Sequence, residues 1–261
     1  MKKLILVAVV ALLAASVPHT TAARGKKGQR YDVYLLIGQS NMAGRGRMIA
    51  SDTTQILDGV WLLNDRGEIE PARSPLNRYS TIRKRLSLQQ VGPGEGFSQE
   101  LHRRTGRKIL LVVNARGGSA LEEWTKGRGN SFYEDAVRRA REAMRYGRLK
   151  AIIWHQGESN GSRSATYLDQ LAGFVADLRA DLGDVPFIAG EIARWNKNAE
   201  AFNGVIAGIA DRIPDSDYVS SEDCTPLIDA SDPHFSRDGQ LLLGRRYAEK
   251  ILKRVYGKTI R

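Results

Sequence analysis

This chain of 261 residues contains a single cysteine, Cys224, and only four histidines. One thiol cannot form an intramolecular disulfide, so the fold must be stabilised by an ordinary hydrophobic core. Cys224 directly follows Glu222 and Asp223, and acidic surroundings raise the pKa of a thiol, which argues against a cysteine nucleophile. The sequence also lacks the Cys/His spacing of a zinc site and the aromatic signature of an RNA-binding module. Its composition therefore does not indicate a nucleic-acid-binding protein.

Long apolar runs are also lacking, apart from residues 4–17 near the N-terminus. This run follows a start that contains two lysines, and small residues follow it up to Ala23. The pattern is typical of a secretory signal peptide, and the run is too short for a comfortable membrane anchor. We therefore expect residues 1–23 to be a signal peptide, 24–30 a basic lead-in and 31–261 a single domain. The protein would be secreted to the periplasm or the medium, without membrane insertion after cleavage.

Acidic residues are outnumbered by basic ones, 29 against 40, which gives a formal net charge of +11. A basic excess can attract acidic polymers, and outside the cytoplasm these include acidic polysaccharides. The sequence thus allows electrostatic contact with such polysaccharides. The simpler interpretation is that most of these bases only keep the surface hydrated.

Short apolar segments typical of strands alternate along the chain with segments of helical periodicity. Strands are predicted at residues 33–37, 108–114, 151–154, 185–192 and 218–220, and helices at residues 96–106, 131–146, 166–182, 199–213 and 241–255. This alternation predicts an α/β fold in which a five-stranded parallel sheet lies between two layers of helices. Residues 60–63 are interpreted as a short strand outside the main sheet.

Ser40 follows the first predicted strand, in the stretch Gly-Gln-Ser-Asn-Met-Ala-Gly at residues 38–44. A serine just beyond a buried strand lies at the carboxyl edge of a parallel sheet, where open α/β sheets bind ligands. If a helix starts there, its free N–H groups favour negative charge at the same place. Ser40 is thus a candidate nucleophile, although serine followed by asparagine is also ordinary helix-cap and turn chemistry.

Three later clusters of polar residues and glycines lie at residues 114–120, 154–160 and 229–236. The first two come straight after predicted strands, and the third precedes the last predicted helix. Each of them could simply form a tight turn, fix a loop or cap a helix. Because parallel strands share one carboxyl edge, we expect the clusters to converge on Ser40 instead. Possible oxyanion donors are the N–H of Ser40, an N–H of Gly117 or Gly118, and the side-chain amide of Gln156.

His234 is the best candidate for a general base. Of the other histidines, His19 lies in the signal segment, His102 in a predicted helix and His155 directly after a strand. Asp232 precedes His234 by two residues, close enough to bond one imidazole nitrogen and leave the other for a serine proton. The chain order Ser, Asp, His is that of hydrolases built on parallel sheets.

The motifs at 38–44, 117–119 (Gly-Gly-Ser), 156–159 (Gln-Gly-Glu-Ser) and 232–234 (Asp-Pro-His) together resemble a known family. Their order and spacing are similar to those of the sialate O-acetylesterase and acetylxylan esterase family of SGNH hydrolases. The first and third motifs are rather specific. The resemblance implies a flavodoxin-like α/β/α sandwich that removes acetyl groups from carbohydrates without a metal or cofactor.

The resemblance also implies roles for individual residues. The catalytic residues would be Ser40, Asp232 and His234, with oxyanion donors at Ser40, Gly118 and Gln156. Gly117 is close enough in sequence to take the place of Gly118. Many SGNH hydrolases have the aspartate three residues before the histidine, where this chain has Ser231, so Asp229 stays as an alternative to Asp232.

Residues within these motifs or close to them are expected to contact the substrate, namely Gln39, Asn41, Arg116, Gly117, Trp124 and Glu158. The sequence therefore predicts a secreted serine esterase that removes O-acetyl groups from a carbohydrate such as acetylated xylan or sialic acid. A lipid or aryl esterase with the same site is one alternative, and a non-catalytic carbohydrate-binding protein is another. The mixture of polar and aromatic residues near the site favours sugars, and the complete Ser-Asp-His set favours an enzyme.

Overall fold

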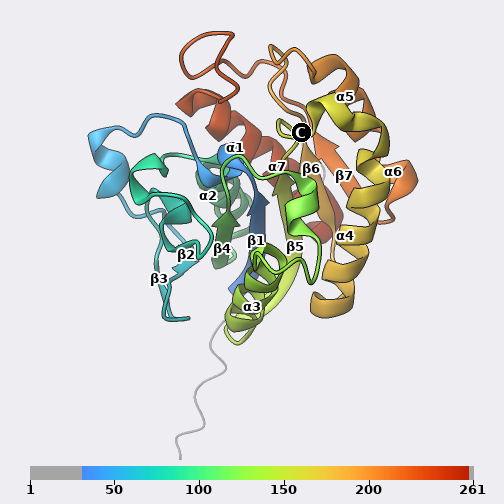
Figure 1. Cartoon of the computed structure of the whole chain (residues 1–261). Coiled ribbons are helices and arrows are strands. Elements are labelled where there is room, and N and C mark those ends of the chain that lie inside the picture. The colour runs from blue at the N-terminus through green and yellow to red at the C-terminus, as the bar shows by residue number, and fades with distance from the viewer. Residues whose placement is uncertain (1–30, 259–261) are drawn as a thin grey trace, which may run out of the picture.

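A seven-stranded β-sheet with helices on both faces organises residues 31–258, the part of the chain that the computed structural model describes (Figure 1). In their order across the sheet, the strands are β3 (Ile69–Pro71), β2 (Val60–Leu63), β4 (Ile109–Ala115), β1 (Tyr31–Gly38), β5 (Gly147–His155), β6 (Phe187–Gly190) and β7 (Ser216–Val219). Neighbouring strands are parallel except β2 and β3, which are antiparallel. The predicted signal peptide and basic lead-in lie outside the described residues.

The prediction of five strands was too low, because it left residues 60–63 outside the sheet. These residues form β2, which pairs with β4 from Val60↔Ile109 onward, and β3 then returns antiparallel at the edge. Val60 and Leu62 are buried in the same core as the central strands, which explains why this short segment joins the sheet. The predicted class, a parallel α/β sheet between two layers of helices, is confirmed.

Helices cover the two faces of the sheet in separate groups. They are α1 (Ser40–Ala43), α2 (Pro93–Thr105), α3 (Phe132–Met144), α4 (Tyr167–Leu182), α5 (Ala199–Ala207), α6 (Ile209–Arg212) and α7 (Arg237–Tyr256). Apolar residues of α3 to α6 pack on one face, and those of α2 and α7 pack on the other. The helix predicted at 199–213 is divided into α5 and α6 at Gly208. Within residues 31–258, no helix is long and apolar enough to cross a membrane.

The central strand β1 contributes to both cores because its side chains alternate between the faces. Val33, Leu35 and Ile37 pack under α3 and α4, whereas Tyr34 and Leu36 face α2 and α7. All of these residues are buried, as expected for a strand covered on both sides. The end of β1 is therefore held rigidly at the centre of the sheet.

The two helices α2 and α7 cross with their backbones in direct contact. A Cβ on Gly244 of α7 would collide with the carbonyl oxygen of Pro93, and one on Gly96 of α2 would collide with that of Leu241. Only glycine permits this approach, so the sequence fixes where the two helices cross.

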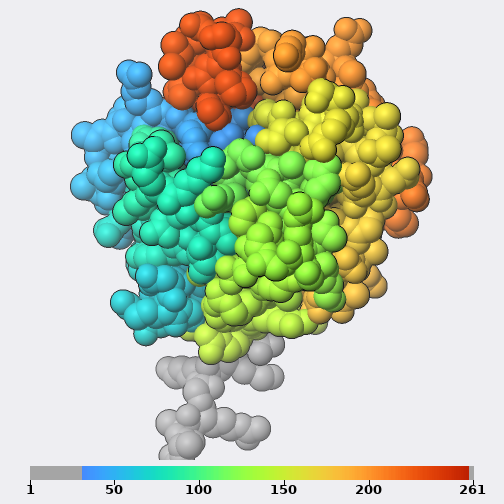
Figure 2. All heavy atoms as spheres, in the orientation of Figure 1, coloured from blue at the N-terminus to red at the C-terminus, as the bar shows by residue number. Residues whose placement is uncertain are grey.

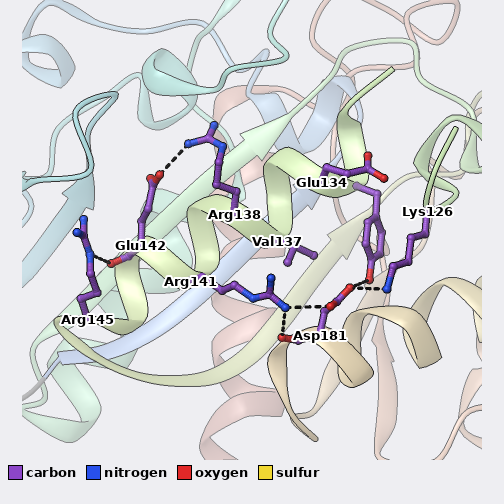
Figure 3. A pocket seen from close by; sticks show the side chains of 9 residues that line it. Lys126, Glu134, Val137, Arg138, Arg141, Glu142, Arg145 and Asp181 are labelled. Atoms are coloured by element: carbon purple, nitrogen blue, oxygen red, sulfur yellow. Dashed lines mark hydrogen bonds and ion pairs between the residues drawn. The ribbon is translucent and has the colours of Figure 1, made fainter. Parts of the chain in front are cut away.

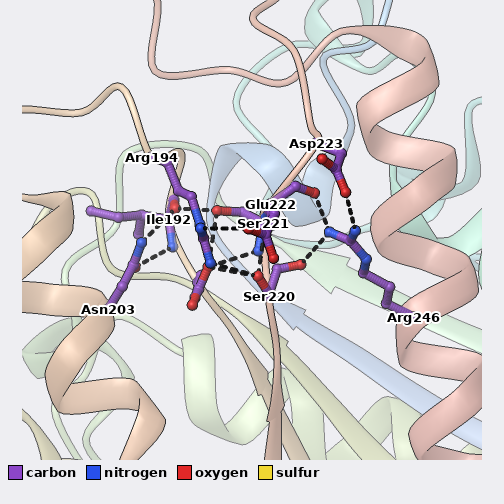
Figure 4. A network of polar contacts seen from close by, with 9 residues as sticks. Ile192, Arg194, Asn203, Ser220, Ser221, Glu222, Asp223 and Arg246 are labelled. Atoms are coloured by element: carbon purple, nitrogen blue, oxygen red, sulfur yellow. Dashed lines mark hydrogen bonds and ion pairs between the residues drawn. The ribbon is translucent and has the colours of Figure 1, made fainter.

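A network of polar contacts ties the ends of β6 and β7 to α7 (Figure 4). The buried carboxylate of Glu191 accepts the backbone N–H of Ser221 at 2.8 Å, and Arg194 lies 3.2 Å from the same oxygen. On the other side, Arg246 of α7 donates to the carbonyl of Ser220 at 2.9 Å. These contacts anchor the start of the long segment that carries Asp232.

Candidate active site

Ser40 lies at the carboxyl end of β1, where the sequence placed it. The strand ends at Gly38, which has a φ of +137°, and a Cβ there would collide with the carbonyl of His155 on β5. Gln39 donates its N–H to that same carbonyl at 2.9 Å, and Ser40 then begins the one-turn helix α1. Ser40 is only 7% exposed, so it lies just below the protein surface and not on a projecting loop. Figure 2 shows blue, green and orange segments, far apart in the sequence, meeting at this end of the molecule.

His234 is paired with Asp232, as predicted. Its Nδ1 lies 2.7 Å from Asp232 Oδ1, and the same oxygen accepts the backbone N–H of His234 at 2.9 Å. The indole N–H of Trp195 donates to the Asp232 carbonyl at 2.6 Å and further fixes the loop. The alternative, Asp229, is exposed and bonds to Ser231 instead of to the histidine. The geometry therefore selects Asp232 as the partner of His234.

The imidazole of His234 has a lowered pKa. Burial is the main cause, because it disfavours the charged form, while the carboxylate of Asp232 opposes the shift and the positive charge of Arg45 adds to it. His234 is therefore neutral around pH 7, with Nδ1–H donating to Asp232 and Nε2 able to accept a proton.

Asn41 connects the turn of Ser40 to the loop of His234. Its Nδ2 donates to Glu158 Oε1 at 2.5 Å and to the carbonyl of Pro233 at 3.1 Å. Its Oδ1 accepts the N–H of Phe235 at 3.2 Å and the side-chain amide of Gln240 at 3.0 Å. The residue is fully buried, and these bonds are all to protein groups; its predicted contact with substrate stays a prediction. Asn41 holds the residues on both sides of His234 against the strand end that carries Ser40.

The glycine pair after β4 lies beside Ser40. A Cβ on Gly117 would be 3.6 Å from Ser40 Cβ, whereas Gly118, at φ +76°, has Lys84 Nζ 3.3 Å from the corresponding point. Within residues 31–258, neither glycine N–H has a hydrogen-bond acceptor. Both remain candidates for an oxyanion donor, and Gly117 is the one that directly adjoins Ser40.

The side-chain amide of Gln156, which was predicted to be an oxyanion donor, forms hydrogen bonds within the protein. Its Nε2 lies 3.1 Å from Gln39 Oε1, 3.2 Å from the Ser119 carbonyl and 2.7 Å from Asn160 Oδ1. Its Oε1 accepts from the hydroxyl of Tyr167 at 2.8 Å, and the residue is fully buried. An amide has two hydrogens, and these three acceptors already engage them. Gln156 therefore fixes Gln39, the neighbour of Ser40, and does not point a free N–H at a ligand.

Gln39 is the side chain that this network presents beside Ser40. Its Oε1 accepts from Gln156, while no hydrogen bond among residues 31–258 uses its Nε2. Gln39 is 3% exposed, so its Nε2 could donate only to a group that lies close to the end of β1. Its contact with substrate stays a prediction.

Three other side chains predicted to bind substrate have different surroundings. Trp124 is fully buried, with its ring centroid 5.3 Å from that of Trp154, and its predicted contact with substrate stays a prediction. Its indole N–H donates to Ser119 Oγ at 3.0 Å and supports the glycine pair from inside the core. Arg116 donates to the Ile82 carbonyl at 2.9 Å. Glu158 keeps one oxygen without a hydrogen-bond partner, and burial raises its pKa.

Arg45 is a residue to which the sequence alone gave no individual role. Its side chain is half-buried, and Nη1 donates to the carbonyls of Gly44 and Leu88 at 2.7 and 2.8 Å. Nη2 lies 2.6 Å from the point where a Gly117 Cβ would be. A signal that could have indicated it is its place between two glycines just after the Ser40 turn.

A groove of about 550 Å³ runs along α3, and neither Ser40 nor His234 lines it (Figure 3). Its charges are paired with one another: Asp181 lies 2.8 Å from Lys126 and 2.9 Å from Arg141, and Arg138 lies 2.7 Å from Glu142. Such mutual pairing leaves little charge for a ligand. In the described part of the chain, no group of three or more His, Cys, Asp or Glu side chains is placed to hold a metal ion.

The parallel α/β sheet has a serine at the end of its central strand and an Asp-paired histidine in a nearby loop, and comparison with known proteins shows that the chain is a carboxylic ester hydrolase. It belongs to the family of carbohydrate esterases described as sialic acid-specific acetylesterases, whose sequence pattern matches residues 30–253. The family predicted from the motifs is thus confirmed.

Relatives in this group resemble the chain over most of its length. A probable carbohydrate esterase of Arabidopsis thaliana is 31% identical over 182 residues, which cover 62% of this chain and 68% of the relative. The solved structure of this same Arabidopsis thaliana protein has a TM-score of 0.75 at 25% identity and covers 87% of this chain and 99% of that one. A carbohydrate acetylesterase from Xanthomonas citri has a TM-score of 0.65 at 20% identity, over 88% of this chain and 57% of that one, which shows the common fold.

Proposed function

We propose that this protein is a secreted serine esterase that removes O-acetyl groups from carbohydrates such as acetylated xylan, sialic acid or a related glycan. The observation that carries the proposal is the pair of Asp232 and His234, held by Asn41 against the strand end that bears Ser40. A buried imidazole with one nitrogen fixed by a carboxylate is suited to take a serine proton. The family adds that the ester is a carbohydrate acetate.

In the proposed reaction, Ser40 Oγ attacks the acetyl carbonyl while His234 Nε2 accepts its proton. The carbonyl electron pair moves onto oxygen, where the N–H groups of Ser40 and of Gly117 or Gly118 stabilise the negative charge. Collapse of this adduct breaks the bond to the sugar oxygen, which takes the proton from His234. Water then attacks the acetyl-enzyme with His234 as base, and acetate and free Ser40 are formed.

The test is acetate release from a panel of acetylated glycans by the wild type and by Ser40→Ala. Losing a triad nucleophile costs kcat on the order of 10⁶, so Ser40→Ala should be inactive on every substrate. The matched control is Ser231→Ala, an exposed serine near the same rim, which should keep wild-type activity. Equal activity of Ser40→Ala and wild type would disprove the mechanism. Hydrolysis of long-chain acyl or aryl esters without any glycan deacetylation would favour the lipid or aryl esterase instead.

Export is part of the proposal and rests on residues 1–23 of the sequence. N-terminal sequencing of the protein recovered from outside the cytoplasm should give a first residue near Ala23 or Arg24. Recovery of an uncleaved chain from the cytoplasm alone would contradict this. Binding of the mature chain to an acidic polysaccharide that weakens with added salt would support electrostatic contact with such polymers.

A further inference from the structure

The oxyanion side of the site lacks the amide donor that the sequence predicted, since Gln156 bonds within the protein. We propose that the guanidinium of Arg45 supplies this missing donor: its Nη2 hydrogen-bonds the oxyanion that forms on the acetyl carbonyl. Arg45 would then be a catalytic residue. The inference rests on the proposed function of Ser40 as the nucleophile.

Arg45 carries a fixed and uncompensated positive charge. Two backbone carbonyls, of Gly44 and Leu88, hold Nη1 at 2.7 and 2.8 Å. Among residues 31–258, no carboxylate lies within 4.0 Å of its guanidinium, whereas Arg107 lies 2.7 Å from Asp32. The Arg45 charge is thus held in place by carbonyl oxygens, and no anion of the protein neutralises it. Donors fixed before the reaction stabilise developing charge without reorganisation.

The close contacts of Gly117 locate the guanidinium of Arg45 relative to Ser40. A Cβ on Gly117 would lie 2.6 Å from Arg45 Nη2 and 3.6 Å from Ser40 Cβ, so the guanidinium and the serine flank the same residue. Gly117 does not have a positive φ, so its backbone conformation does not demand glycine. A Cβ at this position would instead displace the end of the Arg45 side chain. Within the described chain, Nη2 makes no hydrogen bond, which leaves it free for a ligand.

The positive charge of Arg45 also affects the pKa of His234, the proposed general base. After burial, the main cause, it is a further influence that lowers the pKa of His234, against the opposing effect of Asp232. The same cation, whose Nη2 lies beside Gly117 and Ser40, would favour an anion that forms there. In the reaction, the electron pair of the carbonyl moves onto its oxygen, and Nη2–H donates to that oxygen while the Ser40 proton passes to His234. No proton leaves Arg45.

The first test is Arg45→Met, which keeps most of the aliphatic stem and removes the guanidinium. On a small neutral acetyl ester, kcat should fall about 10²–10³-fold, as for loss of one oxyanion donor, with KM unchanged. Labelling by a fluorophosphonate should slow in parallel, because that adduct also places an oxygen in the oxyanion site. The matched control is Arg47→Met, an exposed arginine two residues away, which should keep wild-type values.

The second test is Gly117→Ala, which keeps the charge but pushes the guanidinium away from its place. It should also lower kcat, and combining it with Arg45→Met should add little, because both changes remove the same interaction. This variant decides the question if Arg45→Met does not fold. An unchanged kcat in either folded variant, or a higher KM with unchanged kcat, would overturn the role of Arg45. If Ser40→Ala is inactive in the same assay, that result would leave the proposed function intact.

Discussion

Replacing Asn41 by alanine should damage stability and catalysis together. The change leaves four partners without their hydrogen bonds: the buried Phe235 N–H and Gln240 amide, and the half-buried Glu158 Oε1 and Pro233 carbonyl. An unsatisfied buried group costs about 1–3 kcal/mol, and the costs within one network do not add fully. We expect the free energy of unfolding to fall by about 3–5 kcal/mol, which a domain of ordinary stability survives.

The same change frees the loop that carries His234. A displacement of about 1 Å at a reacting group can cost on the order of 10²-fold in rate, so kcat should fall by at least that factor. Urea unfolding followed by tryptophan fluorescence gives the stability, and acetate release gives kcat.

The control for this prediction is Asn203→Ala. Asn203 bonds both backbone groups of Ile192, at 2.9 and 3.1 Å, and within the described chain it makes no hydrogen bond to residues 229–236. It should lose about 1–2 kcal/mol of stability and keep wild-type kcat. A loss below about 1 kcal/mol for Asn41→Ala, with unchanged kcat, would refute the view that Asn41 holds the site together.

Two further predictions concern carboxyl groups. Asp232→Asn should lower kcat by up to about 10⁴-fold, as for other triads, whereas Asp229→Asn should leave it unchanged; the reverse result in a steady-state assay would reassign the partner of His234. Glu95 is buried, and this raises the pKa of its carboxyl from 4.5 to about 7 despite the hydrogen bond from Ser74. Because the folded state favours the protonated form, the contribution of Glu95 to stability is full below pH 4.5 and is lost as the pH rises through about 7. Glu95→Gln should remove about 3 kcal/mol of this pH dependence, measured by urea unfolding between pH 4 and 8; an unchanged pH slope would contradict the assignment.

The framework of the fold could be predicted because it depends on local patterns. The apolar run of β1, the helix that ends at Gly106 and the strand ends that carry Ser40 and Gln156 are all visible in the sequence. Residues 60–63 were predicted as a strand, but their place in the sheet was missed because β2 has only four residues and pairs with a distant partner, β4; the three-residue edge strand β3 was not predicted.

The roles of individual side chains were harder to predict. A polar residue at a strand end can face a ligand or another polar residue, and the sequence does not distinguish these orientations. Gln156 and Asn41 both bond within the protein, and their partners lie far away in the chain, such as Pro233 for Asn41. Trp124 was expected at a binding surface because aromatic residues favour sugars, yet its ring fills the core under the glycine pair.

The glycines at which α2 and α7 cross also constrain the position of the loop that carries His234. Ser236 caps α7 by accepting the N–H of Gly239 at 3.1 Å, and His234 lies just before this cap. A slip of α7 by one residue would move it by about 1.5 Å and bring a side chain into the place of Gly244, where the backbone of α2 leaves no room. Gly96 and Gly244 therefore fix the position of α7 along its axis, and with it the position of the cap that directly follows the loop of His234.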